Sequence, residues 1–184
     1  MNYDIVDALN DLSGRTHLLD DLVVFFAKDL LFVAFTLFAL ILVPVVRRRS
    51  WLALAQVGTT LVGAYLLGLV AAALHGEQRP FTTHHDIHLL VAHPAGQSFP
   101  SDHATASFAM ALAVLVFVSR RWGWTLMGLA VVIGLARVYA GLHYVGDIAG
   151  SLAVALLAVA LVRLASAALH RRGHWRRTGV AARS

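Results

Sequence analysis

An arginine, a histidine and an aspartate lie close together in a chain that is otherwise strongly apolar. They are Arg137, His143 and Asp147, in the run Ala136-Arg-Val-Tyr-Ala-Gly-Leu-His-Tyr-Val-Gly-Asp147. Ionisable side chains are costly at membrane depth, so each one there suggests a function. His143 and Asp147 are four residues apart, and a helix that begins nearby places them on one face. The carboxylate can then hold one imidazole nitrogen while the other faces a substrate, and Arg137 supplies a permanent charge that suits a phosphate.

Two further polar clusters stand at the ends of apolar stretches. Arg79-Pro80-Phe81 follows the second stretch, and Pro100-Ser101-Asp102-His103 opens the third. Ser101 or Asp102 can cap the third helix, whose free amides and dipole attract anions. Two arginines, a helix N-terminus and two histidines together predict a site for a phosphoryl group.

The composition is that of a membrane protein. The chain has 184 residues, of which 59% are hydrophobic and 14% charged, and its mean hydropathy is +0.72. Soluble domains carry about 25% charged residues. The absence of cysteine excludes disulfides, thiolate catalysis and sulfur-ligated metals. The pI near 10.4 does not indicate nucleic acid, because the basic residues stand at the ends of apolar segments and therefore indicate membrane topology.

Five apolar stretches predict an all-α, polytopic membrane bundle of about five transmembrane helices. Lys28 and Asp29 interrupt the first stretch. Ahead of it, Ile5, Ala8, Leu9 and Leu12 recur at helical spacing and predict a short amphipathic helix on the membrane surface. The five stretches are Leu22–Val46, Trp51–Leu74, His103–Val118, Trp124–Tyr139 and Asp147–Leu164.

Charge sorts the connecting segments into two sets. One set is basic and comprises Arg47, Arg48, Arg49, Arg120, Arg121, Arg171, Arg172, Arg176, Arg177 and Arg183. The other set holds almost every acidic residue and comprises the N-terminal segment, the loop 75–102 and the connection 140–146. The positive-inside rule therefore predicts the N-terminus outside and the C-terminus inside.

The loop His84-His85-Asp86-Ile87-His88, with His93 beyond it, raises the alternative of a zinc site. Its spacing matches no clear ligand pair on a single helix, although His84 and His88 are four residues apart. We favour a solvated loop that lies over the site.

Taken together, the three clusters resemble the type-2 phosphatidic acid phosphatase (PAP2) superfamily of membrane lipid phosphatases. The matching pattern is Arg-Pro, then Pro-Ser-x-His, then Arg-x5-His-x3-Asp, and it covers roughly Leu74 to Gly150. The chain further resembles the BcrC-type undecaprenyl-diphosphatases in the opening Met-Asn-Tyr, the Arg-Pro-Phe run, Phe-Pro-Ser-Asp-His-Ala-Thr and Ala-Arg-Val-Tyr-Ala-Gly-Leu-His-Tyr. The resemblance implies a single integral-membrane domain over residues 1–184, with a motif-bearing core at 74–150 and a basic cytoplasmic tail at 170–184.

The resemblance implies a role for each motif residue. His143 is the expected nucleophile, Asp147 orients it, and His103 is the expected general acid. Arg79, Arg137 and Ser101 are expected to hold the phosphate oxygens, and no metal or other cofactor is implied. Possible accessory residues are Asp102, Gln78 and Pro80.

Two positions depart from the family pattern. Ala72 stands where the first motif usually begins with lysine, and Ala136 stands where serine often precedes the arginine. One phosphate contact is therefore either missing or supplied by Gln78, by His75 or by the N-terminal segment.

The implied activity is hydrolysis of undecaprenyl diphosphate to undecaprenyl phosphate and inorganic phosphate, in competition with bacitracin. The implied location is a bacterial cell membrane, crossed several times, with the site facing the periplasm or exterior. The expected partners are the bilayer and a polyprenyl diphosphate or phospholipid substrate, without nucleic acid; the oligomeric state is not predicted.

Alternative functions are a phosphatidylglycerophosphate or phosphatidic acid phosphatase, and a non-enzymatic protein that binds or transports anionic lipids. Vanadate haloperoxidases carry related motifs, but these proteins are usually soluble and larger.

Overall fold

The computed structural model describes the backbone of residues 2–181 and the side chains of residues 2–171. All regular structure in this part of the chain is helical, and one isolated bridge pairs Gln78 with Gln97. The all-α prediction is therefore confirmed. The helices are α1 (Asn2–Asn10), α2 (His17–Lys28), α3 (Leu30–Arg47), α4 (Trp51–Leu74), α5 (Pro80–Thr83), α6 (Asp102–Phe117), α7 (Arg120–Tyr139) and α8 (Val145–Ala181).

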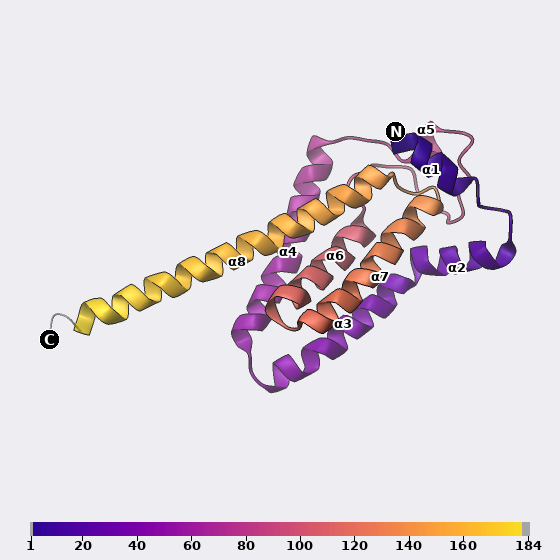
Figure 1. Cartoon of the computed structure of the whole chain (residues 1–184). Helices are drawn as coiled ribbons and strands as arrows, with labels where there is room; N and C mark the ends of the chain where they lie inside the picture. The colour runs from indigo at the N-terminus through magenta and orange to yellow at the C-terminus, as the bar shows by residue number, and fades with distance from the viewer. Residues whose placement is uncertain (1, 182–184) are drawn as a thin grey trace.

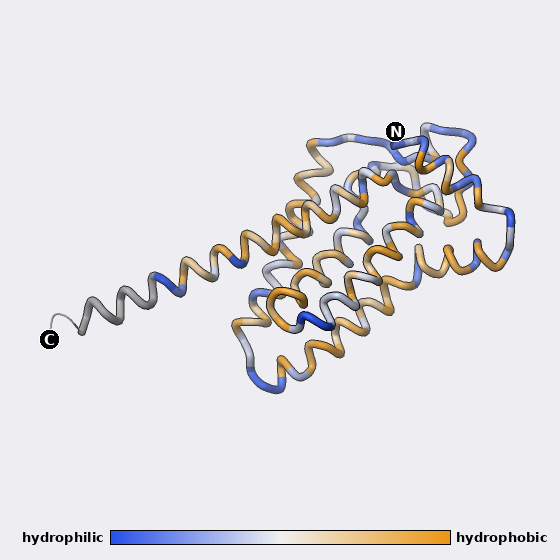
Figure 2. Tube along the Cα trace, in the orientation of Figure 1, coloured by the Kyte–Doolittle hydropathy of each residue, from blue (hydrophilic) through white to orange (hydrophobic). Residues whose placement is uncertain are grey.

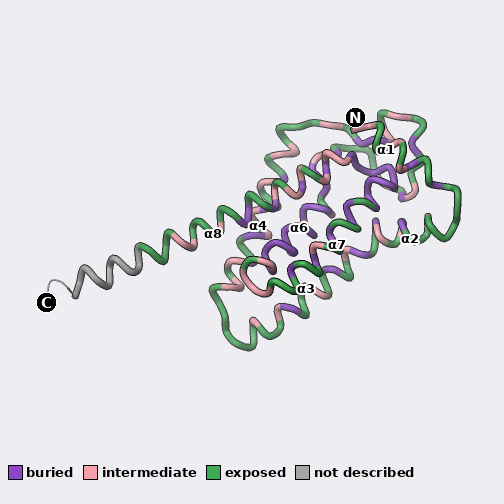
Figure 3. Tube along the Cα trace, in the orientation of Figure 1, coloured by how far each residue is buried: buried purple, intermediate pink, exposed green. Residues whose placement is uncertain are grey.

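Five of these helices form a bundle at the positions of the five predicted spans (Figure 1). The helices α3, α4 and α7 and the segment Val145–Arg171 of α8 are long and apolar enough to cross a membrane. The fifth, α6, is a shorter apolar helix that packs against α4, α7 and α8 and is largely buried (Figure 3). Its buried alanines, among them Ala104, Ala109 and Ala113, allow neighbouring helices to approach closely.

The outward faces of the bundle are apolar, as a lipid-facing surface requires. Large exposed side chains include Phe32 on α3, Leu66 on α4 and Leu161 on α8. Hydrophobic residues run along the helices, whereas hydrophilic residues gather in the connections at the two ends (Figure 2). The helix α8 continues beyond the bundle, and the side chains of the predicted basic tail after Arg171 lie outside the described residues.

The predicted first span over Leu22–Val46 is wrong at its start, because the apolar span is α3 (Leu30–Arg47), beyond the predicted interruption at Lys28 and Asp29. The chain breaks at Asp29 into α2 and α3, because the Asp29 carbonyl accepts the N–H groups of Phe32 and Val33 and so starts a new helix. The last carbonyls of a helix lack partners within it. The break therefore leaves the Ala27 carbonyl at the end of α2 available to another part of the chain.

The predicted N-terminal helix is present as α1, and it docks on the protein through Val6 and Asn10, which are buried. Ile5 remains exposed on this helix, and Leu12 is exposed in the turn that follows it. The Asn10 side chain donates to the carbonyls of Tyr139 (2.8 Å) and His88 (2.9 Å) and accepts from the His88 N–H (2.7 Å). This helix therefore ties the loop 75–101 to the end of α7. Contact of its exposed face with a membrane remains a prediction.

The basic and acidic connections lie at opposite ends of the bundle. Residues 47–50 and 118–121 meet at one end, whereas α1, α5 and the turn between α7 and α8 meet at the other (Figure 1). We call these the basic end and the polar end. The basic and acidic segments of the sequence are thus also separated in space.

The hairpin of α6 and α7 gives a test of this packing. A Cβ atom on Gly123 would lie 2.6 Å from the Leu115 backbone nitrogen, whereas one on Gly128, also on α7, meets no atom within 4 Å. Overpacking costs about 1–3 kcal/mol. We expect Gly123→Ala to lower the melting temperature in detergent and Gly128→Ala to leave it unchanged or higher, because alanine favours helix. Equal melting temperatures for the two variants would contradict the hairpin.

Candidate active site

The three motifs meet at the polar end of the bundle. Arg79 immediately precedes α5, Arg137 lies in the last turn of α7, and His143 lies on the turn that leads into α8. All three side chains are buried, with His143 only 1% exposed. Residues that are far apart in the chain therefore form one buried polar cluster.

Both arginines face the same nitrogen of His143. Its Nε2 lies 3.0 Å from Nη1 of Arg79 and 3.4 Å from Nη2 of Arg137. A guanidinium can only donate hydrogen bonds. Nε2 therefore carries the lone pair, and the hydrogen of the neutral ring lies on Nδ1.

Asp147 holds the opposite side of the ring. Its Oδ2 accepts from His143 Nδ1 at 3.2 Å, from the Tyr144 N–H at 2.8 Å and from the Ser98 hydroxyl. The predicted contact between His143 and Asp147 is confirmed, although His143 lies in the turn before α8 and Asp147 in the first turn of the helix. Three donors to a single oxygen fix the carboxylate and, through it, the ring orientation.

Ser98 is a residue of this cluster that the sequence interpretation missed. It is fully buried, its hydroxyl donates to Asp147, and its Oγ lies 3.4 Å from His143 Nδ1. The Ser98 N–H donates to the Glu77 carbonyl at 2.8 Å, next to the bridge between Gln78 and Gln97. A serine two residues ahead of a Pro-Ser motif carries no local signal for this contact.

Burial, with the charges of Arg137 and Arg79, lowers the pKa of His143 to about 4, although its hydrogen bond to Asp147 acts in the opposite direction. The ring is therefore neutral at pH 7. Burial also lowers the pKa of Arg79, against the opposing charges of Asp102 and Asp147. A neutral imidazole with its lone pair among cations is suited to attack an anionic electrophile.

Backbone carbonyls aim the two guanidinium groups. Arg79 Nη1 donates to the Leu142 carbonyl, and Arg137 Nη1 donates to the Ala27 carbonyl, each at 3.2 Å. The second acceptor is the carbonyl that the break between α2 and α3 leaves available. The interruption at Lys28 and Asp29 thus contributes directly to the site.

The second motif lies beside this cluster. Of the two candidate caps, Ser101 occupies the N-cap position of α6 and is fully buried, but its hydroxyl makes no cap hydrogen bond. Its carbonyl instead accepts from the Ser151 hydroxyl at 3.1 Å and so joins the start of α6 to α8. Half-buried His103 and exposed Asp102 face a groove that they share with Arg79.

Several donors of the site have no acceptor among the described residues. Arg79 Nε, Arg137 Nε and Ser101 Oγ are buried and make no hydrogen bond. Unsatisfied buried donors are costly, and they are rare in folded proteins. The oxygens of a phosphoryl group between His143 and these donors would supply the acceptors.

The accessory positions occupy the edge of the site. Pro80 is buried at the first position of α5, where proline suits a helix start. Gln78 is exposed and bridges to Gln97, His75 pairs with Glu77 at 3.3 Å, and Ala72 lies in the groove wall.

The histidine loop packs on the N-terminal helix. His84 stacks on Tyr3 with ring centroids 3.9 Å apart, and the Tyr3 hydroxyl donates to Asp86. This hydrogen bond raises the pKa of Tyr3 to about 12. Among the described side chains, no group of three or more histidines and carboxylates is placed to hold a metal ion.

Gly141 sets the turn that carries His143. Its φ is +73°, a conformation that suits glycine, and a Cβ there would lie 2.6 Å from Ile87 Cγ2. The turn therefore fits closely beneath the histidine loop.

An apolar groove leads from the site into the bundle between α3, α4 and α6. It encloses about 560 Å³. Arg79, His103 and Asp102 line its polar part, and Leu31, Phe35 and Met110 belong to its apolar part. The groove therefore suits a ligand with an anionic head and an apolar tail.

Comparison with known proteins agrees with this geometry. Residues 53–171 match the family model described as the PAP2 superfamily. The chain is 34% identical over 157 residues to undecaprenyl-diphosphatase BcrC of Bacillus subtilis, covering 85% of this chain and 80% of that protein. It is 29% identical to the bacitracin transport permease protein BcrC of Bacillus licheniformis, covering 88% of this chain and 79% of that protein.

Solved structures share the fold. LpxE of Aquifex aeolicus aligns with a TM-score of 0.71 at 21% identity, over 88% of this chain and 93% of that one. A PAP2-type phosphatidylglycerolphosphate phosphatase of Bacillus subtilis aligns with a TM-score of 0.57 at 21% identity, over 87% and 83% of the two chains. The match to the family model over residues 53–171 and the 34% identity to the Bacillus subtilis protein show that this chain belongs to the PAP2 superfamily.

Proposed function

We propose that this protein hydrolyses undecaprenyl diphosphate to undecaprenyl phosphate and inorganic phosphate in a bacterial cell membrane. The observation that carries the proposal is the His143 ring, which Asp147 holds at Nδ1 while two arginines face Nε2. The name of the Bacillus subtilis relative supports the choice of substrate. The function is that of a lipid phosphatase that recycles a lipid carrier for cell-wall synthesis.

The reaction proceeds in two displacements. His143 Nε2 attacks the terminal phosphorus, the bond from that phosphorus to the bridging oxygen breaks, and His103 gives its proton to the leaving lipid phosphate. A water molecule then attacks the phosphohistidine, loses a proton to His103 and releases inorganic phosphate. A histidine nucleophile divides one difficult displacement into two easier ones.

The surrounding residues stabilise the charges that develop. Arg79, Arg137 and Ser101 hold the non-bridging oxygens, because their buried donors at Nε and Oγ have no acceptor among the described residues. Phosphoryl transfer depends mainly on such positioning and positive charge. Asp147 stabilises the imidazolium that forms during attack, and Ser98 fixes the position of Asp147. Asp102 contributes as an accessory residue that positions His103.

The groove between α3, α4 and α6 holds the part of the polyprenyl tail nearest the head. The polar end faces the periplasm or exterior, with the N-terminus outside and the C-terminus inside. The support for this orientation is the concentration of arginines in residues 47–49 and 120–121 at the other end. Bacitracin sequesters the same substrate and therefore competes with the protein.

The nucleophile can be tested by His143→Ala in purified protein, with phosphate release measured on undecaprenyl diphosphate, phosphatidylglycerophosphate and phosphatidic acid. We expect a loss of at least about 100-fold, since a covalent catalyst contributes several kcal/mol. His85→Ala, an exposed change in the histidine loop, is the control and should retain activity. A smaller loss in His143→Ala would reject the nucleophile, and equal turnover of the three lipids would reject the narrow substrate.

Ser98 can be tested as a positioning residue. We expect Ser98→Ala to lower kcat about 10- to 100-fold with KM little changed, because a hydrogen bond to a charged group contributes about 1.5–3 kcal/mol. Ser107→Ala is a matched control, since Ser107 is equally buried and its hydroxyl donates only to the Ala104 carbonyl. Equal kcat in the two variants would show that the contact of Ser98 with Asp147 is only structural.

The tail groove can be tested with Gly68→Leu. A Cβ on Gly68 makes ordinary contacts of 3.8 Å with Pro100 and 3.9 Å with Thr105, so a leucine extends into the groove. We expect turnover of undecaprenyl diphosphate to fall about tenfold, while a short-chain polyprenyl diphosphate is hydrolysed at the normal rate. Gly58→Leu on the same helix, where a Cβ meets no atom within 4 Å, should affect neither substrate. Equal losses on both substrates would place the defect in the catalytic site.

A further inference from the structure

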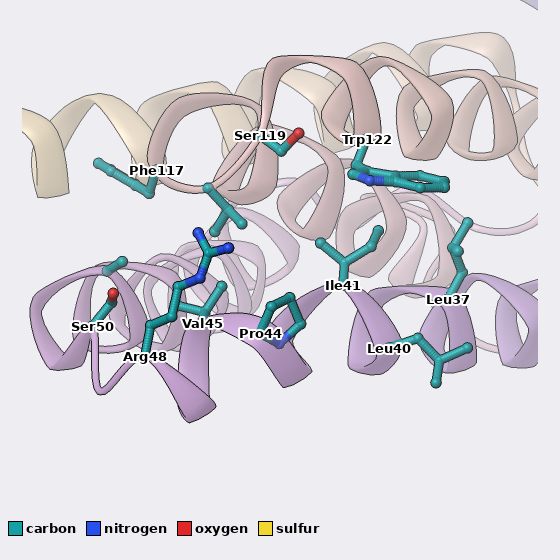
Figure 4. Close-up of a pocket in the computed structure, with 12 residues that line it drawn as sticks. Leu37, Leu40, Ile41, Pro44, Val45, Arg48, Ser50, Phe117, Ser119 and Trp122 are labelled. Carbon is teal, nitrogen blue, oxygen red and sulfur yellow. The ribbon is translucent and has the colours of Figure 1, made fainter.

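A second pocket lies at the basic end, remote from His143. It encloses about 550 Å³ between α3, the start of α4 and the connection from α6 to α7 (Figure 4). Its apolar wall includes Leu37, Ile41 and Phe117. Arg48, Ser50 and Ser119 add polar groups. The proposed phosphatase reaction makes no use of this pocket.

The arginine of this pocket has no counter-charge among the described residues. In Figure 4 the Arg48 side chain extends from the end of α3 towards the segment that carries Phe117 and Ser119. No ion pair or hydrogen bond joins its guanidinium to another described side chain. The sequence holds no aspartate or glutamate in residues 30–76 or 103–146, which include every residue that lines the pocket. The pocket is therefore complementary to an anion.

The other polar groups of the pocket can also bind an anion. Ser50 and Ser119 immediately precede α4 and α7, and neither side chain caps its helix, so both hydroxyls remain available to a ligand. Trp122 lies across the pocket from Arg48 in the same view, and the Arg121 guanidinium lies 5.8 Å from the centre of its ring. A second cation thus stands close to the pocket, next to a side chain that favours the membrane interface.

We propose that this pocket binds one anionic phospholipid. Its phosphate contacts Arg48, Ser50 and Ser119, and one acyl chain lies against Leu37, Ile41 and Phe117. A polyprenyl tail alone would leave Arg48 without an anion, and a free phosphate would leave the apolar wall without a ligand. A lipid that joins an anionic head to an apolar chain satisfies both parts.

The test is lipid binding to the purified, delipidated full chain, measured by native mass spectrometry with phosphatidylglycerol and phosphatidylcholine. We expect Arg48→Gln to weaken phosphatidylglycerol binding about fivefold, and the matched change Arg47→Gln, outside the pocket, to alter it less than about twofold. Ala53→Phe, which fills the pocket without a change of charge, should also weaken binding.

Three outcomes would overturn the proposal. Equal losses in Arg47→Gln and Arg48→Gln would show diffuse surface charge, and equal binding of phosphatidylcholine would remove the role of the anion. Displacement of phosphatidylglycerol by a neutral polyprenol would assign the pocket to a lipid tail. If a variant aggregates, the rise in melting temperature that phosphatidylglycerol gives to the wild type supplies the second measurement, and Ala53→Phe should reduce that rise.

Discussion

The structure depends on two buried guanidinium groups held beside one neutral imidazole. Like charges repel strongly where little water screens them. Arg79 and Arg137 nevertheless both approach Nε2 of His143, because a backbone carbonyl accepts from each of them. These carbonyls come from Leu142 and Ala27. The site therefore needs both the turn before α8 and the end of α2 in place.

The rest of the polar end serves that arrangement. Asp147 collects three donors on one oxygen, which sets the tautomer and direction of His143. Asn10 makes three hydrogen bonds with the backbone of His88 and Tyr139, so the N-terminal helix closes over the turn at Gly141. Contacts of this kind position a nucleophile before the substrate arrives, and positioning is what phosphoryl transfer chiefly requires.

The two ends of the bundle carry cations in different environments. At the polar end, Arg79 and Arg137 are buried and the charges of Asp102 and Asp147 act on Arg79. At the basic end, Arg48 is exposed beside an apolar pocket and no acidic residue is near it in sequence. The first environment suits a reacting phosphoryl group, and the second suits a lipid that remains bound. Between them, the buried helix α6 joins the two ends into one packed unit.

The sequence alone predicts most of the helical segments, the separation of charge and the three motifs, because apolar runs and charged residues act locally. It also placed His143 and Asp147 within reach of each other, since they are only four residues apart. The folded structure was needed to show that the Ala27 carbonyl at the end of α2 accepts from Arg137, that Ser98 donates to Asp147 and that the Ser101 hydroxyl does not cap α6. Each of these depends on distances between residues far apart in the chain or on a side-chain rotamer, and no local pattern of residue types specifies either.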